Sequence, residues 1–245
     1  MVTPPLEAFT REQIEEVFAK PAIREVAFEI RFPPRLRVNA ELWKFQDRLA
    51  EEYPNPDSEG ILLPPSTVPI NVSVFQNPTA GRIVKVSQQN FVIAFTSYTC
   101  FEDFKAEVLA KTNVFCEVFD IKSLTRVGLR YVNEINLPED GQRASMLRYV
   151  RPPLDFSRVS IESVEEFVNQ MRIRHKNHMV LVRSALLPTP GTEKRVYILD
   201  IDCHGQGPLQ TVDLEAILET YHDTAQRFFL DHITEDFKDI MRGKR

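Results

Sequence analysis

Glycine and cysteine are scarce in this chain of 245 residues, which has 8 glycines and 3 cysteines. So few glycines disfavour the Gly-rich loops that hold phosphates in nucleotide-binding enzymes. The cysteines, Cys100, Cys116 and Cys203, are odd in number and widely spaced, so neither a disulfide framework nor a zinc cage is indicated. We therefore expect reduced thiols, no metal site and no cofactor.

Long apolar runs are also missing, and charge of one sign does not dominate. No run of about 18 apolar residues occurs, so we expect no membrane-spanning helix. The segment Met1–Phe9 holds two prolines and a glutamate where a signal peptide needs a basic and then an apolar stretch, which predicts a cytoplasmic protein. The 30 Lys+Arg against 35 Asp+Glu give a net charge of −5, which argues against a protein built mainly to coat nucleic acid.

The apolar residues, 43% of the chain, suffice for a core and follow two periodicities. They predict the order strand, helix, three strands, helix, twice over. In the first half (1–121) we expect a short helix at 10–20, with Thr10 and Gln13 as a capping box, and then a strand at 23–32. A second helix is expected between Asn39, its cap, and Pro54, which closes it, with Trp43 on its inward face, and a proline-rich loop follows to Pro65. Strands at 67–76, 82–88 and 91–98 and a helix opened by Thr99 and Glu102 complete this half. In the second half (122–245) we expect a strand at 123–136, a helical turn near 145–149, and strands at 165–175, 178–187 and 194–203. A long helix at 212–241 follows, and Thr234 is a candidate cap for a restart within it, so an unbroken helix and a broken one both stay open.

This element order predicts an α+β fold, an antiparallel sheet with helices on one face. The two halves are expected to pack as one compact domain, and their matching order suggests a duplicated unit. The order resembles the TATA-binding-protein-like and helix-grip folds, in which a curved sheet lies against a long helix. Such a resemblance implies architecture and leaves function open.

Three segments carry a resemblance to a known family. They are PAIREVAFEIRF at Pro21–Phe32, TRVGLRYVNEI at Thr125–Ile135 and ILDID at Ile198–Asp202. Together, in this order, they resemble a sporadically distributed family of uncharacterised prokaryotic proteins. The resemblance spans most of the chain and implies its size and fold, and it implies no activity.

Charged residues alternate along two of the predicted strands. Arg126 and Arg130 fall on one face of the first strand of the second half, and Asp200 and Asp202 share a face of its last strand. One hypothesis makes the acidic pair, with His204 just beyond it, an acid/base group, while the two arginines clamp an anionic substrate.

A second hypothesis, which we favour, treats the same charges as structural. In this interpretation the arginines and aspartates pair with each other, or with Glu29 and Arg31, as cross-strand ion pairs. Half-solvated sheet faces routinely carry such ladders. Gly128, on the same face as the arginines, leaves room for a close neighbour or a ligand, or marks a bulge or a bend in the sheet, and we favour a structural role.

The most basic stretch of the chain is the hairpin predicted at 165–187. It carries Arg172, Arg174, Lys176 and Arg183, with His175 and His178 on either side of its turn. Such a cluster is a candidate contact for nucleic-acid phosphates. An exposed hairpin tip explains the charges equally and is the more common case.

No catalytic motif connects these features, so binding is the leading functional hypothesis. We expect a non-enzymatic binding or interaction module that engages a protein partner or a small ligand, and a homodimer is compatible with it. The alternatives are an enzyme that acts on an anionic substrate through the acidic pair and the arginine clamp, and a nucleic-acid binder that uses the basic hairpin.

Overall fold

The computed structural model describes residues 9–61, 70–137, 146–156, 159–189, 191–192 and 194–244. Its helices are α1 (Arg11–Ile14), α2 (Leu36–Ala40), α3 (Leu42–Leu49), α4 (Phe101–Phe119), α5 (Leu214–His232) and α6 (Glu235–Met241). Its strands are β1 (Ile23–Arg31), β2 (Asn55–Ile61), β3 (Ile70–Asn77), β4 (Arg82–Val86), β5 (Asn90–Phe95), β6 (Ser123–Asn136), β7 (Phe167–His175), β8 (His178–Pro188) and β9 (Arg195–Gln210). Short 3-10 turns lie at Met146–Arg148, Ile161–Ser163 and Thr211–Asp213.

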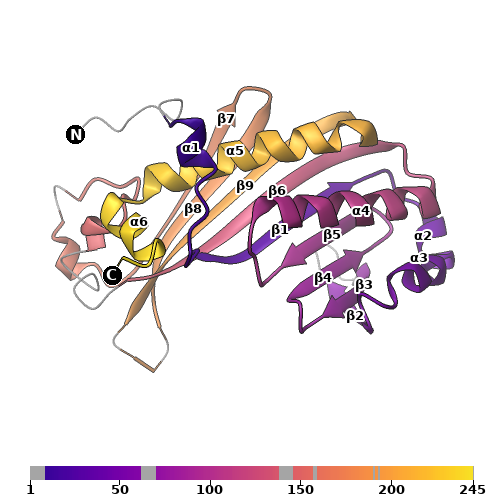
Figure 1. Cartoon of the computed structure of the whole chain (residues 1–245), viewed down its shortest axis with the longest axis horizontal. Helices are drawn as coiled ribbons and strands as arrows, with labels where there is room; N and C mark the ends of the chain where they lie inside the picture. The colour runs from indigo at the N-terminus through magenta and orange to yellow at the C-terminus, as the bar shows by residue number, and fades with distance from the viewer. Residues whose placement is uncertain are drawn as a thin grey trace. The chain divides into compact units, whose positions relative to one another are not determined.

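The strands form a nine-stranded antiparallel sheet in the order β2-β3-β4-β5-β1-β6-β9-β8-β7 (Figure 1). This confirms the predicted α+β class with an antiparallel sheet. The meander β3–β4–β5 is also confirmed, with Phe75 opposite Val84 and Val84 opposite Ile93. The duplication and the likeness to TATA-binding-protein-like or helix-grip folds stay predictions.

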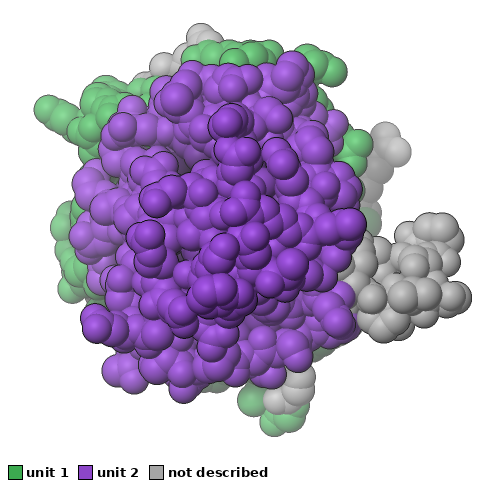
Figure 2. Space-filling model, turned by 90° about the vertical axis from the view of Figure 1, so that its right-hand side faces the viewer, with its two compact units in different colours: residues 1–24, 130–203, 221–245 green, residues 25–129, 204–220 purple. Residues whose placement is uncertain are grey.

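The chain forms two compact units, coloured separately in Figure 2. Unit 1 comprises residues 1–24, 130–203 and 221–245, and unit 2 comprises residues 25–129 and 204–220. The boundary therefore passes through β1, β6, β9 and α5, and the units do not coincide with the halves 1–121 and 122–245.

Unit 2 is held together by a cluster of phenylalanines between α3, α4 and its strands. Phe91 of β5 stacks on Phe115 of α4 with ring centroids 4.4 Å apart, and Phe45 of α3 meets Phe115 edge-on at 5.5 Å. All three side chains are fully buried. Aromatic pairs of this kind contribute about 0.5–1.5 kcal/mol beyond their buried area, so these rings fix α3 and α4 to this part of the sheet.

The helical region before β2 differs from the prediction. Asn39 lies inside α2 and caps nothing, because the chain leaves helical geometry at Glu41 and α3 begins at Leu42. Phe45 and Leu49 of α3 lie in the core, whereas Trp43 is 59% exposed. The prediction that Trp43 faces inward was wrong, because Trp43 stands on a different side of the helix from these two residues.

Strand β2 falls in the stretch that we predicted as a proline-rich loop. It pairs with β3 from Asn55 opposite Gln76 to Ile61 opposite Ile70. Its sequence, NPDSEGI, has no apolar alternation that would reveal a strand. The strand is defined instead by its backbone pairing with β3. Pro56 is compatible with this place, since edge strands tolerate a residue without an N–H group.

Helix α4 confirms the predicted apolar stripe but not the predicted start. Its N-cap is Cys100, and no side chain caps it. The Thr99 hydroxyl donates to the Asp103 carboxylate at 3.0 Å instead. The capping-box prediction for Thr99 and Glu102 was therefore wrong by one position.

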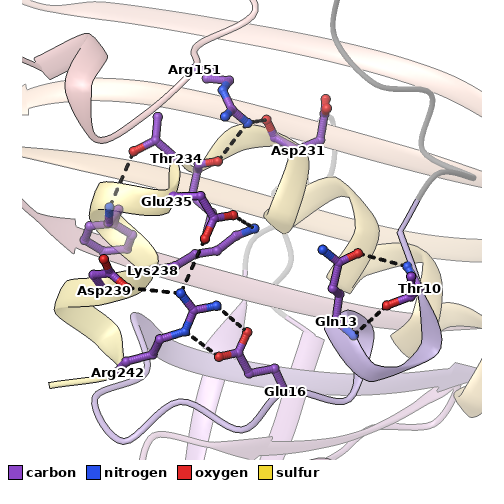
Figure 3. A network of polar contacts seen from close by, with 12 residues as sticks. Thr10, Gln13, Glu16, Arg151, Asp231, Thr234, Glu235, Lys238, Asp239 and Arg242 are labelled. Carbon is purple, nitrogen blue, oxygen red and sulfur yellow. Dashed lines mark hydrogen bonds and ion pairs between the residues drawn. The ribbon is translucent and has the colours of Figure 1, made fainter. Parts of the chain in front are cut away.

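The ends of unit 1 are fixed by helix caps and ion pairs (Figure 3). Thr10 and Gln13 form the predicted capping box, although α1 ends already at Ile14. Thr234 caps α6, which confirms the predicted restart of the last helix. Arg242, which follows directly after α6, donates to both carboxylate oxygens of Glu16, at 2.6 and 2.9 Å, and so connects the end of the last helix to the segment after α1.

Candidate functional site

In unit 1 the strands have an inner face, which contacts α5, and an outer face, which points away from it. The ring of Tyr221 lies 4.8 Å from that of His178 on β8, and Phe228 lies 6.5 Å from His175 on β7. Tyr131 on β6 bonds His222 of α5 at 2.9 Å. Because neighbouring residues of a strand point to opposite faces, Arg130 and the other even-numbered residues of β6 fall on the outer face.

Three charged residues from three strands meet on this outer face. Arg130 of β6 donates through Nε and Nη2 to both oxygens of Asp200 on β9, at 2.8 and 2.9 Å. Arg183 of β8 donates through Nη1 to Asp200 Oδ2 at 3.1 Å. The aspartate side chain is 8% exposed and each arginine side chain is 43% exposed. One nearly buried carboxylate thus positions two guanidinium groups that reach solvent.

The same face continues onto β7. Arg183 Nε donates to Gln170 Oε1 at 2.8 Å, and Gln170 lies directly opposite Arg183 in the register of the two strands. Arg172 and Arg174 follow on the same side of β7, and both are exposed. Within the part of the chain that the structure describes, neither forms an ion pair. We call Arg130, Arg172, Arg174 and Arg183 the basic face.

The hairpin that carries much of this face has the predicted tight turn. His175 pairs with His178, so the turn consists of Lys176 and Asn177. Lys176 is exposed and takes a left-handed conformation, with φ at 52°. Both histidines point to the inner face, where His178 is buried, so they are packed beneath the basic face and are not part of it.

The other predicted site residues occupy different surroundings. Asp202 lies on the outer face of β9 and is half-buried. His204 belongs to unit 2 and is half-buried. We predicted that the strand ends at residue 203 and that His204 follows it. In the structure β9 continues to Gln210, so His204 lies within the strand. Arg126 also belongs to unit 2, where it forms an ion pair with Glu29 of β1.

Gly128 leaves the space that the Arg126 side chain occupies. A Cβ atom built on Gly128 would lie 2.6 Å from Arg126 Nη1 and 3.0 Å from its Cζ. The guanidinium group therefore folds back over the glycine on its way to Glu29. A neighbouring side chain therefore fills the space that a Cβ atom of Gly128 would take.

The cysteines and histidines form no metal-binding cluster within the described residues. The three cysteines are free thiols. Burial raises the pKa of Cys116 to about 12 and also raises the pKa of Cys203, so both are protonated at neutral pH. Within the ranges that the structure describes, no group of three or more His, Cys, Asp or Glu side chains is placed to hold a metal ion.

Sequence reasoning named the members of the basic face but not their arrangement. It assigned Arg130 to a clamp for an anionic substrate and Arg183 to a nucleic-acid hairpin, whereas both bind the same carboxylate. It missed Gln170 altogether. The signal for Gln170 was present, since it stands two residues before Arg172 in an alternating strand.

Chemically, the arrangement is an oriented pair of cations. Both oxygens of Asp200 accept hydrogen bonds from arginines, so the carboxylate is engaged as an acceptor. Arginine presents its donors in a planar fork that matches carboxylate and phosphate groups. The face can therefore bind an anion.

Comparison with known proteins adds no family. No family model and no curated protein sequence matches this chain. The resemblance carried by the segments FEIRF, RVGLRYVNEI and ILDID stays a prediction. No helix within the described residues is both long and apolar enough to cross a membrane.

Proposed function

We propose that the chain is a non-enzymatic binding module that engages an acidic protein partner through the basic face of unit 1. The observation that carries the proposal is the shared contact of Arg130 and Arg183 with Asp200. Two guanidinium groups are held in place before any partner arrives. Groups that are ordered in advance lose less conformational entropy on binding, which favours affinity.

The neighbours of the arginines favour a protein over a nucleic acid. Proteins that bind single strands stack bases on aromatic side chains. Within the described residues, the outer positions of β7 and β8 hold no aromatic residue, and Val168, Met179 and Leu181 accompany the arginines there. Arginine and methionine are enriched in protein interfaces. A net charge of −5 also disfavours a polyanion as long as DNA or RNA.

The geometry gives less support to the enzyme alternative. Asp200, its proposed acid/base group, is engaged by Arg130 and Arg183. Of its two proposed clamp residues, Arg126 pairs with Glu29. A binding role uses the arginines as they are placed and needs no free carboxylate. We keep the expectation that the module works in the cytoplasm, which rests on the sequence.

The proposal is tested by mapping an acidic probe onto the protein. We would titrate the protein, labelled with nitrogen-15, with polyglutamate at low salt and follow the arginine Nε–Hε signals. We expect those of Arg172, Arg174 and Arg183 to shift together and the binding to weaken as salt is added. Shifts confined to other arginines would contradict the proposal. Displacement of polyglutamate by a short single-stranded oligonucleotide at equal charge concentration would instead favour the nucleic-acid alternative.

A further inference from the structure

Strand β7 is an edge of the sheet as far as the described residues extend. The strand order ends with β7, which pairs with β8 over its nine residues, from Phe167 opposite Leu186 to His175 opposite His178. In a strand, successive N–H and C=O groups point alternately to the two sides. Half of the backbone groups of β7 therefore point away from β8, toward the side where an incoming strand would pair.

We propose that the acidic partner of the basic face binds as an added strand along β7, through a segment in which acidic and apolar residues alternate. The inference rests on the proposed function and makes it more specific, since it names the conformation and the pattern of the partner. Strand addition to a sheet edge is a common mode of peptide recognition, in which the backbone supplies affinity and alternate side chains supply specificity.

The acidic half of the pattern follows from the outer face of β7. Arg172 and Arg174 are exposed there and form no ion pair in the described part of the chain. Residues directly opposite each other on paired strands have Cβ atoms about 4.5–5.5 Å apart. Carboxylates at alternate positions of an added strand would therefore face these two arginines, with Arg183 one strand further in.

The apolar half follows from the inner face of the same strand. Phe167, Met171 and Ile173 are only half-buried, although residues on the same face of β8 are buried. These three side chains lie on the last strand in the sheet order, so no further strand packs beside them among the described residues. The alternate side chains of an added strand would extend the core over them, which favours apolar residues at those positions.

A second copy of this chain is a poorer occupant of the edge. The nine residues of β7 include no acidic residue. An antiparallel pair of β7 strands would bring arginines of two copies onto one face with no carboxylate on either strand to separate them. Like charges on neighbouring strands are destabilising, so the edge is better suited to an acidic strand than to itself.

The test compares two peptides of equal composition. The first alternates glutamate and valine over nine residues, the length of β7, and the second places the same residues in one glutamate block and one valine block. Each is added to the whole protein, and amide hydrogen exchange is followed residue by residue. We expect the alternating peptide to bind at least about tenfold more tightly. We also expect it to slow exchange at every second amide of β7, those that point away from β8.

Three results would overturn the inference. If both peptides bind equally and no amide of β7 is slowed, the partner contacts the arginines without adding a strand, and the proposed function stands. If neither peptide binds while polyglutamate does, the inference fails and the proposed function again stands. If alternate amides of β7 are already slowed in the free protein, in proportion to protein concentration and with a dimeric native mass, the occupant is a second copy. Failure of polyglutamate as well would remove the proposed function itself.

Discussion

Arg130 and Asp200 form a bidentate ion pair between β6 and β9, with Nε–Oδ1 and Nη2–Oδ2 distances of 2.8 and 2.9 Å. Since Arg183 donates to the same carboxylate, Asp200 orients two of the four arginines of the basic face. Its place beneath the arginines, 8% exposed, means that water cannot readily replace its oxygens as acceptors.

Replacing Asp200 by asparagine should destabilise the protein by about 1–3 kcal/mol, the usual cost of leaving charged, partly buried donors without a charged acceptor. The amide group would also turn one donor toward the guanidinium groups. Urea denaturation measures the change. Asp47→Asn serves as the control, because Asp47 is exposed on α3 and should tolerate the same exchange within about 0.5 kcal/mol. Equal stability of the two variants would contradict the structural role of Asp200.

Replacing Gly128 by alanine should cost about 1 kcal/mol, because the new methyl group would lie 2.6 Å from Nη1 of Arg126 and would push the end of this flexible side chain away from Glu29. Shortening the neighbour should relieve the overlap. In the double variant Arg126→Ala with Gly128→Ala, the loss should therefore be smaller than the sum of the two single losses. If the loss of unfolding free energy in the double variant equals the sum of the losses in the two single variants, the side chain of Arg126 does not lie over the glycine.

His232 should make the stability of the protein depend on pH below about 6.5. Its Nδ1 donates to the carbonyl of Phe228 at 2.7 Å, and burial lowers its pKa because the charged form is poorly solvated. The unfolded chain then binds the extra proton more readily than the folded chain. The free energy of unfolding is thus fully retained above pH 6.5 and falls as the pH drops toward the lowered folded pKa, by at most about 1.4 kcal/mol per pH unit.

The variant His232→Gln isolates this effect, since glutamine keeps a donor for Phe228 and does not titrate. Urea midpoints of both proteins at several values between pH 5 and 8 give the comparison. The other four histidines titrate equally in both, so their contributions cancel in the difference. Parallel curves for the two proteins would rule out a buried, neutral His232.

Thr234 should contribute about 1 kcal/mol as the cap of α6. Its hydroxyl oxygen accepts from the N–H of Phe237 at 3.4 Å, and the hydroxyl also contacts the carbonyl oxygens of Arg148 and Tyr149, at 2.5 and 3.2 Å. Thr234→Ala removes all three contacts, whereas Thr234→Ser keeps the hydroxyl group. Thermal denaturation should rank the proteins as wild type, then serine, then alanine. An alanine variant as stable as the serine variant would contradict the capping role.

Local signals in the sequence predicted much of the fold. The bounds of β6, the capping box of Thr10 and the restart at Thr234 were predicted from alternation and capping residues alone, because those features depend on neighbours in the chain. Strand β2 was missed, since an edge strand without apolar alternation is defined only by its partner. The cap at Asn39 was wrong, because the chain is already helical from Leu36 and leaves helical geometry only at Glu41.

The candidate site was predictable in its members and not in its assembly. Alternation placed Arg130 and Asp200 each on a charged strand face, and cross-strand pairing was the favoured interpretation. It could not reveal that β8 lies beside β9 and brings Arg183 to the same carboxylate. Alternation within one strand tells which residues share a face, whereas the residues that meet across β6, β9 and β8 depend on how the three strands pair.

The most direct test of the central claim is the affinity of polyglutamate for two variants of equal charge. One is Arg172→Gln with Arg174→Gln, on the basic face. The other is Arg37→Gln with Arg48→Gln, which removes two exposed arginines of α2 and α3 in unit 2. If the basic face binds the partner, the first variant should lose at least about tenfold in affinity at physiological salt, while the second should stay close to wild type. Equal losses in both would show that polyglutamate responds to net charge alone, and the proposed binding face would be wrong.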